Sequence, residues 1–157
     1  MNAKSFLKVV MLAGIVVCVG FLSGCEKKTP VSAVKPLEII DVKIGIGDKQ
    51  VDQFNASDKI KISYDVKNMF AINIGGKPYI WVRQDIMIRD SKNAIVLVRP
   101  AVLEIKRPVN QKPARFINEV SLSTIKNLKP GNFKIHIFLT DIVSFQTAKN
   151  IVPFVIK

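Results

Sequence analysis

Cysteine is scarce in this sequence, and the positions of its two copies exclude two kinds of site. Cys18 lies inside an uncharged apolar segment and Cys25 follows it, so the chain after Cys25 contains no cysteine. A disulfide framework and a cysteine-based metal site are therefore excluded for that part of the chain. The single histidine, His136, cannot complete a metal site without cysteine or carboxylate partners. We expect no metal and no other cofactor.

Catalytic motifs are also missing. No serine lies in a Gly-x-Ser-x-Gly turn, and the sequence has neither a P-loop nor a Gly-x-Gly-x-x-Gly run. No carboxylate pair is marked by its spacing. A catalytic triad would need His136, which strand alternation places outward near the middle of a strand. The sequence therefore predicts no catalytic residue, and we expect a protein that is not an enzyme.

Acidic residues are outnumbered two to one. The chain has 24 Lys and Arg against 12 Asp and Glu, a net charge of +12. Such an excess favours acidic partners, among them anionic lipid, polyanionic glycan and nucleic acid. The lysines are dispersed, and no run is longer than Lys27-Lys28, so we expect no nucleic-acid partner. Lysines scattered over exposed strand positions for solubility are the other interpretation of this charge.

The longest uncharged apolar segment is too short to cross a bilayer. It runs from Val9 to Leu22, 14 residues, against about 20 for a membrane-spanning helix. Two lysines precede it, and the small residues Ser23 and Gly24 follow it, directly before Cys25. A basic start, an apolar core and a cleavage site of small residues are typical of a signal peptide.

Leu22-Ser23-Gly24-Cys25 resembles the lipobox of bacterial lipoproteins. The resemblance implies cleavage before Cys25, a diacylglyceryl thioether on Cys25 and usually a third acyl chain, such as palmitate, on the new amine. Two or more chains anchor a protein stably to a membrane. Enterobacterial lipoproteins commonly carry Asp after the cysteine as a signal for the inner membrane, but Glu26 stands here. We therefore expect the bacterial cell envelope, at the outer membrane facing the periplasm.

The chain divides into three parts on composition. Residues 1–24 are the expected signal peptide, and residues 25–36 are the lipidated cysteine and a tether with two prolines and no periodicity. The eleven residues from Glu26 to Pro36 reach roughly 36 Å when fully extended. Residues 37–157 are long enough to bury one core.

Residues 37–157 contain short runs rich in Ile, Val and Phe, separated by turn residues at fairly even spacing. This pattern predicts an all-β domain. A break is expected at Pro100, which cannot donate a ladder hydrogen bond. The expected strands are 37–46, 59–66, 79–89, 94–98 with a continuation over 103–105, 115–122, 133–140 and 151–156.

Seven strands over about 120 residues resemble an immunoglobulin or fibronectin type III domain. The strongest local resemblance is Leu128–Phe133, which is similar to the turn into the sixth strand of such domains. Phe133 stands where the family often has a tyrosine, and the family's intersheet cysteine pair is missing. The resemblance implies a seven-stranded, immunoglobulin-like antiparallel sandwich.

The third expected strand, 79–89, has two faces of different character. Ile80, Val82, Ile86 and Ile88 share one parity, whereas Tyr79, Trp81, Arg83 and Met87 share the other. If the Ile and Val set is the core, the second set is an exposed stripe of residue types enriched in interfaces. His136 and Phe138 of the sixth strand would then widen it. The alternatives are a buried Trp81, as in immunoglobulin domains, and a bulge near Gln84 that switches the faces.

The connection 68–76 is unusually apolar for a loop. It is either a binding tip or a cover over one open end of the core. Taken together, these features predict a membrane-anchored envelope lipoprotein that acts as a non-enzymatic interaction module, for example as an accessory subunit of an envelope complex. Its partners would be the membrane, through the lipid on Cys25, and an envelope protein. The alternative is a basic module that binds peptidoglycan, lipopolysaccharide or anionic lipid.

Overall fold

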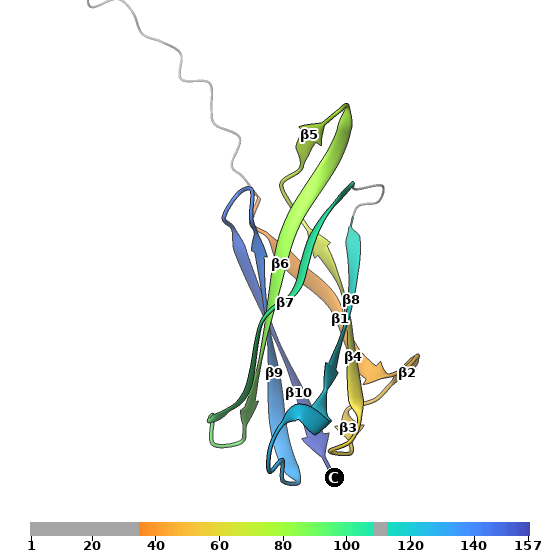
Figure 1. The fold of residues 1–157 in the computed structure, drawn as a ribbon, viewed down its shortest axis with the longest axis vertical. Helices are drawn as coiled ribbons and strands as arrows, with labels where there is room; N and C mark the ends of the chain where they lie inside the picture. Colours follow the sequence, from red (N-terminus) through yellow and green to blue (C-terminus); the bar gives the residue numbers. More distant parts are fainter. Residues whose placement is uncertain (1–34, 109–112) are drawn as a thin grey trace, which may run out of the picture. The chain divides into compact units, whose positions relative to one another are not determined.

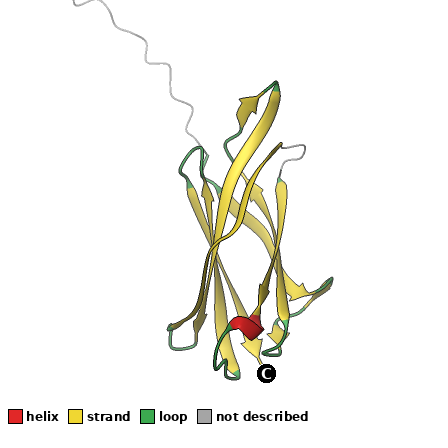
Figure 2. Ribbon diagram, in the orientation of Figure 1, coloured by secondary structure: helices red, strands yellow, loops and turns green. Residues whose placement is uncertain are grey.

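The computed structural model describes residues 35–108 and 113–157, so the expected signal peptide and Cys25 lie outside the described residues. The described part is built almost entirely of strands, with a single 3-10 turn (Figures 1 and 2). In chain order the elements are β1 (Glu38–Ile46), β2 (Lys49–Gln50), β3 (Gln53–Phe54), β4 (Lys59–Lys67), β5 (Ile72–Ile74), β6 (Lys77–Asp90), β7 (Ile95–Pro108), β8 (Ala114–Ser121), η1 (Leu122–Thr124), β9 (Gly131–Asp141) and β10 (Thr147–Ile156). The all-β prediction is confirmed.

The strands form two sheets around one core. The first sheet has the order β2-β1-β4-β8, and the second has the order β3-β10-β9-β6-β5, with β7 also paired to β6. The described chain has ten strands rather than the seven expected, because β2, β3 and β5 are two or three residues long. A second correction concerns direction: β3 pairs with β10 in parallel, whereas the other pairs are antiparallel.

Apolar and polar residues alternate along the long strands, and the apolar ones form the core. The inward residues of β4 are almost completely buried, as are those of β9, and both predictions are confirmed. Each of these strands lies inside its sheet, so one face is covered by the other sheet and every second residue must be apolar. The buried positions are Ile60, Ile62, Tyr64 and Val66 on β4 and Phe133, Ile135, Ile137 and Leu139 on β9.

The expected break at Pro100 is a bulge within a continuous strand. β7 pairs Arg99 with Ile86 and Leu103 with Gln84, which leaves residues 100–102 without ladder partners. The missing N–H of Pro100 therefore costs no ladder hydrogen bond. Asp85 of β6 holds the bulge, because its Oδ1 accepts a 2.6 Å hydrogen bond from the Ala101 amide.

Residues 36 and 37 are held by hydrogen bonds at one end of the domain. The Leu37 amide donates to Gln146 Oε1 at 2.8 Å, and Asn68 Nδ2 donates to the Pro36 carbonyl at 2.8 Å. We call residues 35–37, 68–70 and 141–146 the tether end. The C-terminus lies at the opposite end (Figure 1). Over the described ranges, no helix has the length and apolar character needed to cross a membrane.

Candidate interaction surface

The two faces of β6 are clearly separated. Ile80, Val82, Ile86 and Ile88 are at most 2% exposed and belong to the core. Gln84 has the same parity and is also buried, so no bulge in β6 switches its faces. The outward face carries the predicted stripe, in which each side chain is half-buried: Tyr79, Trp81, Arg83 and Met87. Of the alternatives left open by the sequence, burial of Trp81 in the core is therefore wrong.

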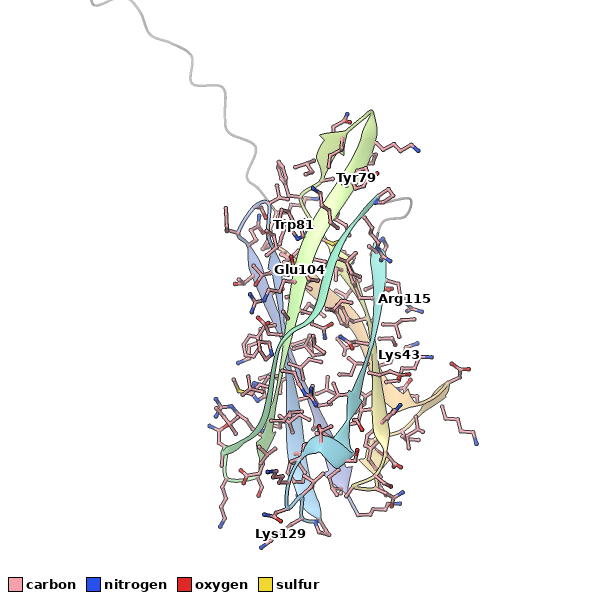
Figure 3. The ribbon with its side chains drawn as sticks, viewed as in Figure 1. Lys43, Tyr79, Trp81, Glu104, Arg115 and Lys129 are labelled. Carbon is pink, nitrogen blue, oxygen red and sulfur yellow. The ribbon has the colours of Figure 1, made fainter. Side chains whose placement is uncertain are left out.

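Trp81 is already engaged by β7. Its indole Nε1 donates to Glu104 Oε1 at 3.0 Å, and Lys106 Nζ lies 5.3 Å from the ring centroid. Figure 3 shows Trp81 and Glu104 together on the strands that carry them. A cation over an indole face is a favourable contact. Both the polar edge and one face of this ring are thus used within the domain.

Arg83 is likewise held by a neighbour. Its Nε donates to Asp85 Oδ1 at 3.1 Å, and the same carboxylate holds the β7 bulge. Tyr79 pairs in register with Ile72 of β5 and with Pro108 of β7. Trp81, Arg83 and Tyr79 form the polar half of the β6 outer face, in which the side chains of Trp81 and Arg83 are engaged within the domain.

The other half of this face is apolar and continuous across four strands. Ladder register places Val98 of β7, Met87 of β6, His136 of β9 and Ile151 of β10 in one row. Phe138 follows His136 by two residues on β9 and therefore lies on the same face. We call these five residues the sheet-face patch. Val98 is 52% exposed and Ile151 is 46% exposed, so the row reaches solvent at both ends.

His136 is buried in the middle of this patch, although the sequence predicted an exposed histidine. It points outward, as alternation requires, but only 7% of it is exposed. Met87 and Ile151 flank it in register, and the Phe138 ring stacks on it with a centroid distance of 6.3 Å. Its Nε2 has no hydrogen-bond partner among the described residues.

Burial is the main cause that lowers the pKa of His136 below its usual value, and the positive charges of Lys149, Arg89 and Lys134 lower this pKa further. Lys149 also places its Nζ 5.3 Å from the Phe138 ring centroid. The sheet-face patch therefore has an apolar centre around His136 and basic side chains at its margin.

The structure thus brings together three of the six predicted surface residues, namely Met87, His136 and Phe138. It adds Val98 and Ile151, which the sequence analysis missed. A signal for Ile151 was available, because Val152, Phe154 and Ile156 alternate inward and leave Ile151 outward. Val98 carried no such signal, since its face depends on a register shift between Ile88 and Arg89.

Within residues 35–108 and 113–157, no three His, Cys, Asp or Glu side chains gather where they could hold a metal ion. Cys25, the predicted lipidation site, lies outside the described residues.

Comparison with known protein families finds no match, and comparison with curated proteins finds none. Solved structures are similar to this chain at low identity. OgpA from Akkermansia muciniphila is 16% identical over 77% of this chain and 28% of that chain, with a TM-score of 0.45. The alkylpurine DNA glycosylase AlkC from Pseudomonas fluorescens, bound to DNA, is 12% identical over 77% and 30%, with a TM-score of 0.49. Beta-glucuronidase 2 from Bacteroides uniformis is 10% identical over 77% and 15%, with a TM-score of 0.42.

The prediction that this chain is not an enzyme is contradicted by these structures, because the proteins in them are enzymes. The chain spans less than a third of the length of each. With every TM-score below 0.5, the similarity assigns no reaction and no catalytic residue to this chain.

Proposed function

We propose that this chain is a lipid-anchored protein of the bacterial cell envelope whose β-domain binds a partner protein through the sheet-face patch. The observation that carries the proposal is the apolar row Val98–Met87–His136–Ile151 on the outer face of the second sheet. The anchor is the lipid expected on Cys25, and the partner is another component of an envelope complex.

The contrast between the outer faces of the two sheets supports a partner-binding role. The central strand of the first sheet, β4, presents polar residues to solvent, as an uncovered antiparallel sheet normally does: Lys59, Lys61, Ser63 and Asp65. The second sheet instead presents a row in which the apolar side chains of Val98, Met87 and Ile151 lie beside the buried ring of His136. A contiguous apolar patch with a charged margin is typical of protein interfaces.

The arrangement of the long strands supports an immunoglobulin or fibronectin type III architecture for this domain. Strands β1, β4 and β8 form the first sheet, and β7, β6, β9 and β10 form the second. The long strands thus number seven, three in one sheet and four in the other, which supports the seven-stranded sandwich proposed from the sequence. Such domains present sheet faces and loops to partners, but the fold alone does not carry function.

Site-specific crosslinking in cells tests the partner surface. A photoreactive phenylalanine analogue at Val98 is compared with the same analogue at Ile117 on the outer face of β8. The two positions are matched, with 52% and 53% exposure. We expect a discrete protein adduct from position 98 and none from position 117. Equal adducts from both positions, or none from position 98, would refute the proposed surface.

The anchor is tested separately. Cys25→Ser should abolish incorporation of labelled palmitate and leave an unprocessed precursor. Normal palmitate incorporation by this variant would show that the lipobox assignment is wrong.

A basic groove on the first sheet supports a second candidate function, binding of an acidic envelope glycan such as peptidoglycan or lipopolysaccharide. It has a volume of about 280 Å³, and Lys43, Lys61 and Arg115 line it (Figure 3 labels Lys43 and Arg115). Lys61 is paired with Asp48 at 2.8 Å and Arg115 with Asp65 at 2.9 Å, which reduces the charge available for a ligand. Salt-sensitive glycan binding that Lys43→Glu abolishes would favour this function.

A further inference from the structure

The tether end presents two exposed aromatic rings. Phe145, in the turn between β9 and β10, is 80% exposed, and Phe70, in the loop before β5, is 51% exposed. Their neighbours behave differently, since Met69 and Ala71 pack against the core. The connection 68–76 therefore covers the core through Met69 and Ala71 and directs Phe70 into solvent. Its interpretation as a binding tip stays a prediction.

Asp141, whose carboxylate is buried, holds the backbone at both aromatic positions. Asp141 is completely buried, and its Oδ2 accepts a 2.6 Å hydrogen bond from the Phe70 amide. Its Oδ1 accepts from the amides of Val143 and Ser144 at 2.9 and 3.2 Å. The Phe145 amide donates to the Asp141 carbonyl at 2.8 Å. The loop and the turn are thus joined through one residue, and the two aromatic positions are ordered before any ligand binds.

The backbone at Phe145 is strained. Its φ is 57°, in the left-handed region that suits glycine or asparagine rather than an aromatic residue. Strain of this kind is more common at functional positions than elsewhere. A solvent-directed phenylalanine gains little from the fold in return, and a ligand outside the domain would supply the contact that its ring lacks.

Two exposed lysines belong to or directly precede the segments of the tether end. Lys35 begins the described chain, and Lys67 directly precedes the loop that carries Phe70. Exposed aromatic rings and lysines in the same segments match the border between acyl chains and anionic headgroups, where each basic residue contributes favourably.

We propose that the tether end is a membrane-contacting surface, with Phe145 and Phe70 inserted among the lipid headgroups and the lysines on anionic lipid. This inference rests on the proposed lipid anchor. The residues before Lys35 join the domain at this end, and only eleven residues separate Cys25 from Leu37. The bilayer that holds Cys25 is therefore the surface that lies within reach of these rings.

Depth-dependent quenching tests the contact. The expected mature chain contains only Cys25, and that thiol is lipidated, so Phe145→Cys, Phe70→Cys, Ile117→Cys and Lys129→Cys each add a unique labelling site to the lipidated protein. Ile117 is the matched exposed apolar control on the side of the domain, and Lys129 lies at the opposite end (Figure 3). Each protein carries an environment-sensitive fluorophore and is reconstituted in phosphatidylglycerol vesicles with brominated acyl chains.

We expect a blue shift and quenching at positions 145 and 70, with neither at positions 117 and 129. Palmitate incorporation separates this proposal from the anchor on which it rests. A protein that carries palmitate and floats with vesicles, yet leaves position 145 unquenched, retains the anchor and overturns the contact. A protein without palmitate that is still quenched at position 145 retains the contact and overturns the lipid anchor.

Discussion

Tyr64 offers a direct test of how the core is built. Its side chain is completely buried at the centre of β4, and its ring stacks on Phe116 of β8 with a centroid distance of 5.6 Å and an interplanar angle of 16°. Its hydroxyl has no hydrogen-bond partner within the described part of the chain. Tyr64→Phe removes this hydroxyl and leaves the ring and its stacking in place.

The expected magnitude follows from the two contributions. A buried polar group without a partner costs about 1–3 kcal/mol, and Tyr64→Phe removes that cost. The ring itself is worth more, since truncation of a buried aromatic residue to alanine costs roughly 3–5 kcal/mol. We therefore expect Tyr64→Phe to raise the free energy of unfolding by about 1 kcal/mol or more and Tyr64→Ala to lower it by several times that amount.

Urea unfolding of the full chain at neutral pH measures the free energy of unfolding of both variants. Tyr79→Phe is the half-buried control, and we expect it to change that free energy by no more than about 0.5 kcal/mol. A loss of stability in Tyr64→Phe would refute the reasoning, because it would mean that the hydroxyl has a favourable partner.

Alkaline pH gives a second check. Burial raises the pKa of Tyr64 above its usual value, so its contribution to stability is complete below the unfolded-state pKa of about 10 and is lost as pH rises further. Tyr64→Phe should remove that loss.

Three further predictions follow from buried or strained groups. His136 has a lowered pKa, so its contribution to stability is complete above the unfolded-state pKa of about 6.5 and is lost on acidification; urea midpoints at pH 7.5 and 5 should differ less in His136→Phe. Asp141→Ala leaves three backbone amides without their acceptor and should cost about 3 kcal/mol in urea unfolding, against under 1 kcal/mol for Ser144→Ala. Phe145→Gly relieves a left-handed φ and should raise the free energy of unfolding by about 0.5–1 kcal/mol, which a higher melting temperature would report. A lower melting temperature would show that the ring packs within the domain.

The sequence predicts those strands in which one face is covered along the whole length. In β4, lysine, serine and aspartate alternate with Ile60, Ile62 and Tyr64, and this pattern admits only one orientation. The short strands β2 and β3 have two residues each, too few for a period to be visible. The course of β7 was also not predictable, because its bulge at residues 100–102 shifts the phase of the alternation within one strand.

The candidate surface was predictable in part for the same reason. Parity alone places Met87, His136 and Phe138 outward once Ile86, Ile135 and Ile137 are assigned to the core. The burial of His136 was not predictable, because it depends on which residues of neighbouring strands lie beside it. That register comes from pairing between segments distant in the sequence, and a one-residue slip would replace each neighbour by one that faces the core.

The two proposed surfaces constrain each other through β6. Val82 of this strand pairs with Asp141 of the tether end, and Met87 of the sheet-face patch lies five residues further along the strand. At about 3.3 Å per residue, Met87 lies roughly 16 Å along the strand from the level of Asp141. A domain that touches the bilayer with Phe70 and Phe145 and stands upright would hold the sheet-face patch at about that distance from the headgroups, on its side. A partner that binds this patch must therefore extend well into the aqueous space, because a protein confined to the bilayer and its headgroups would not reach Met87.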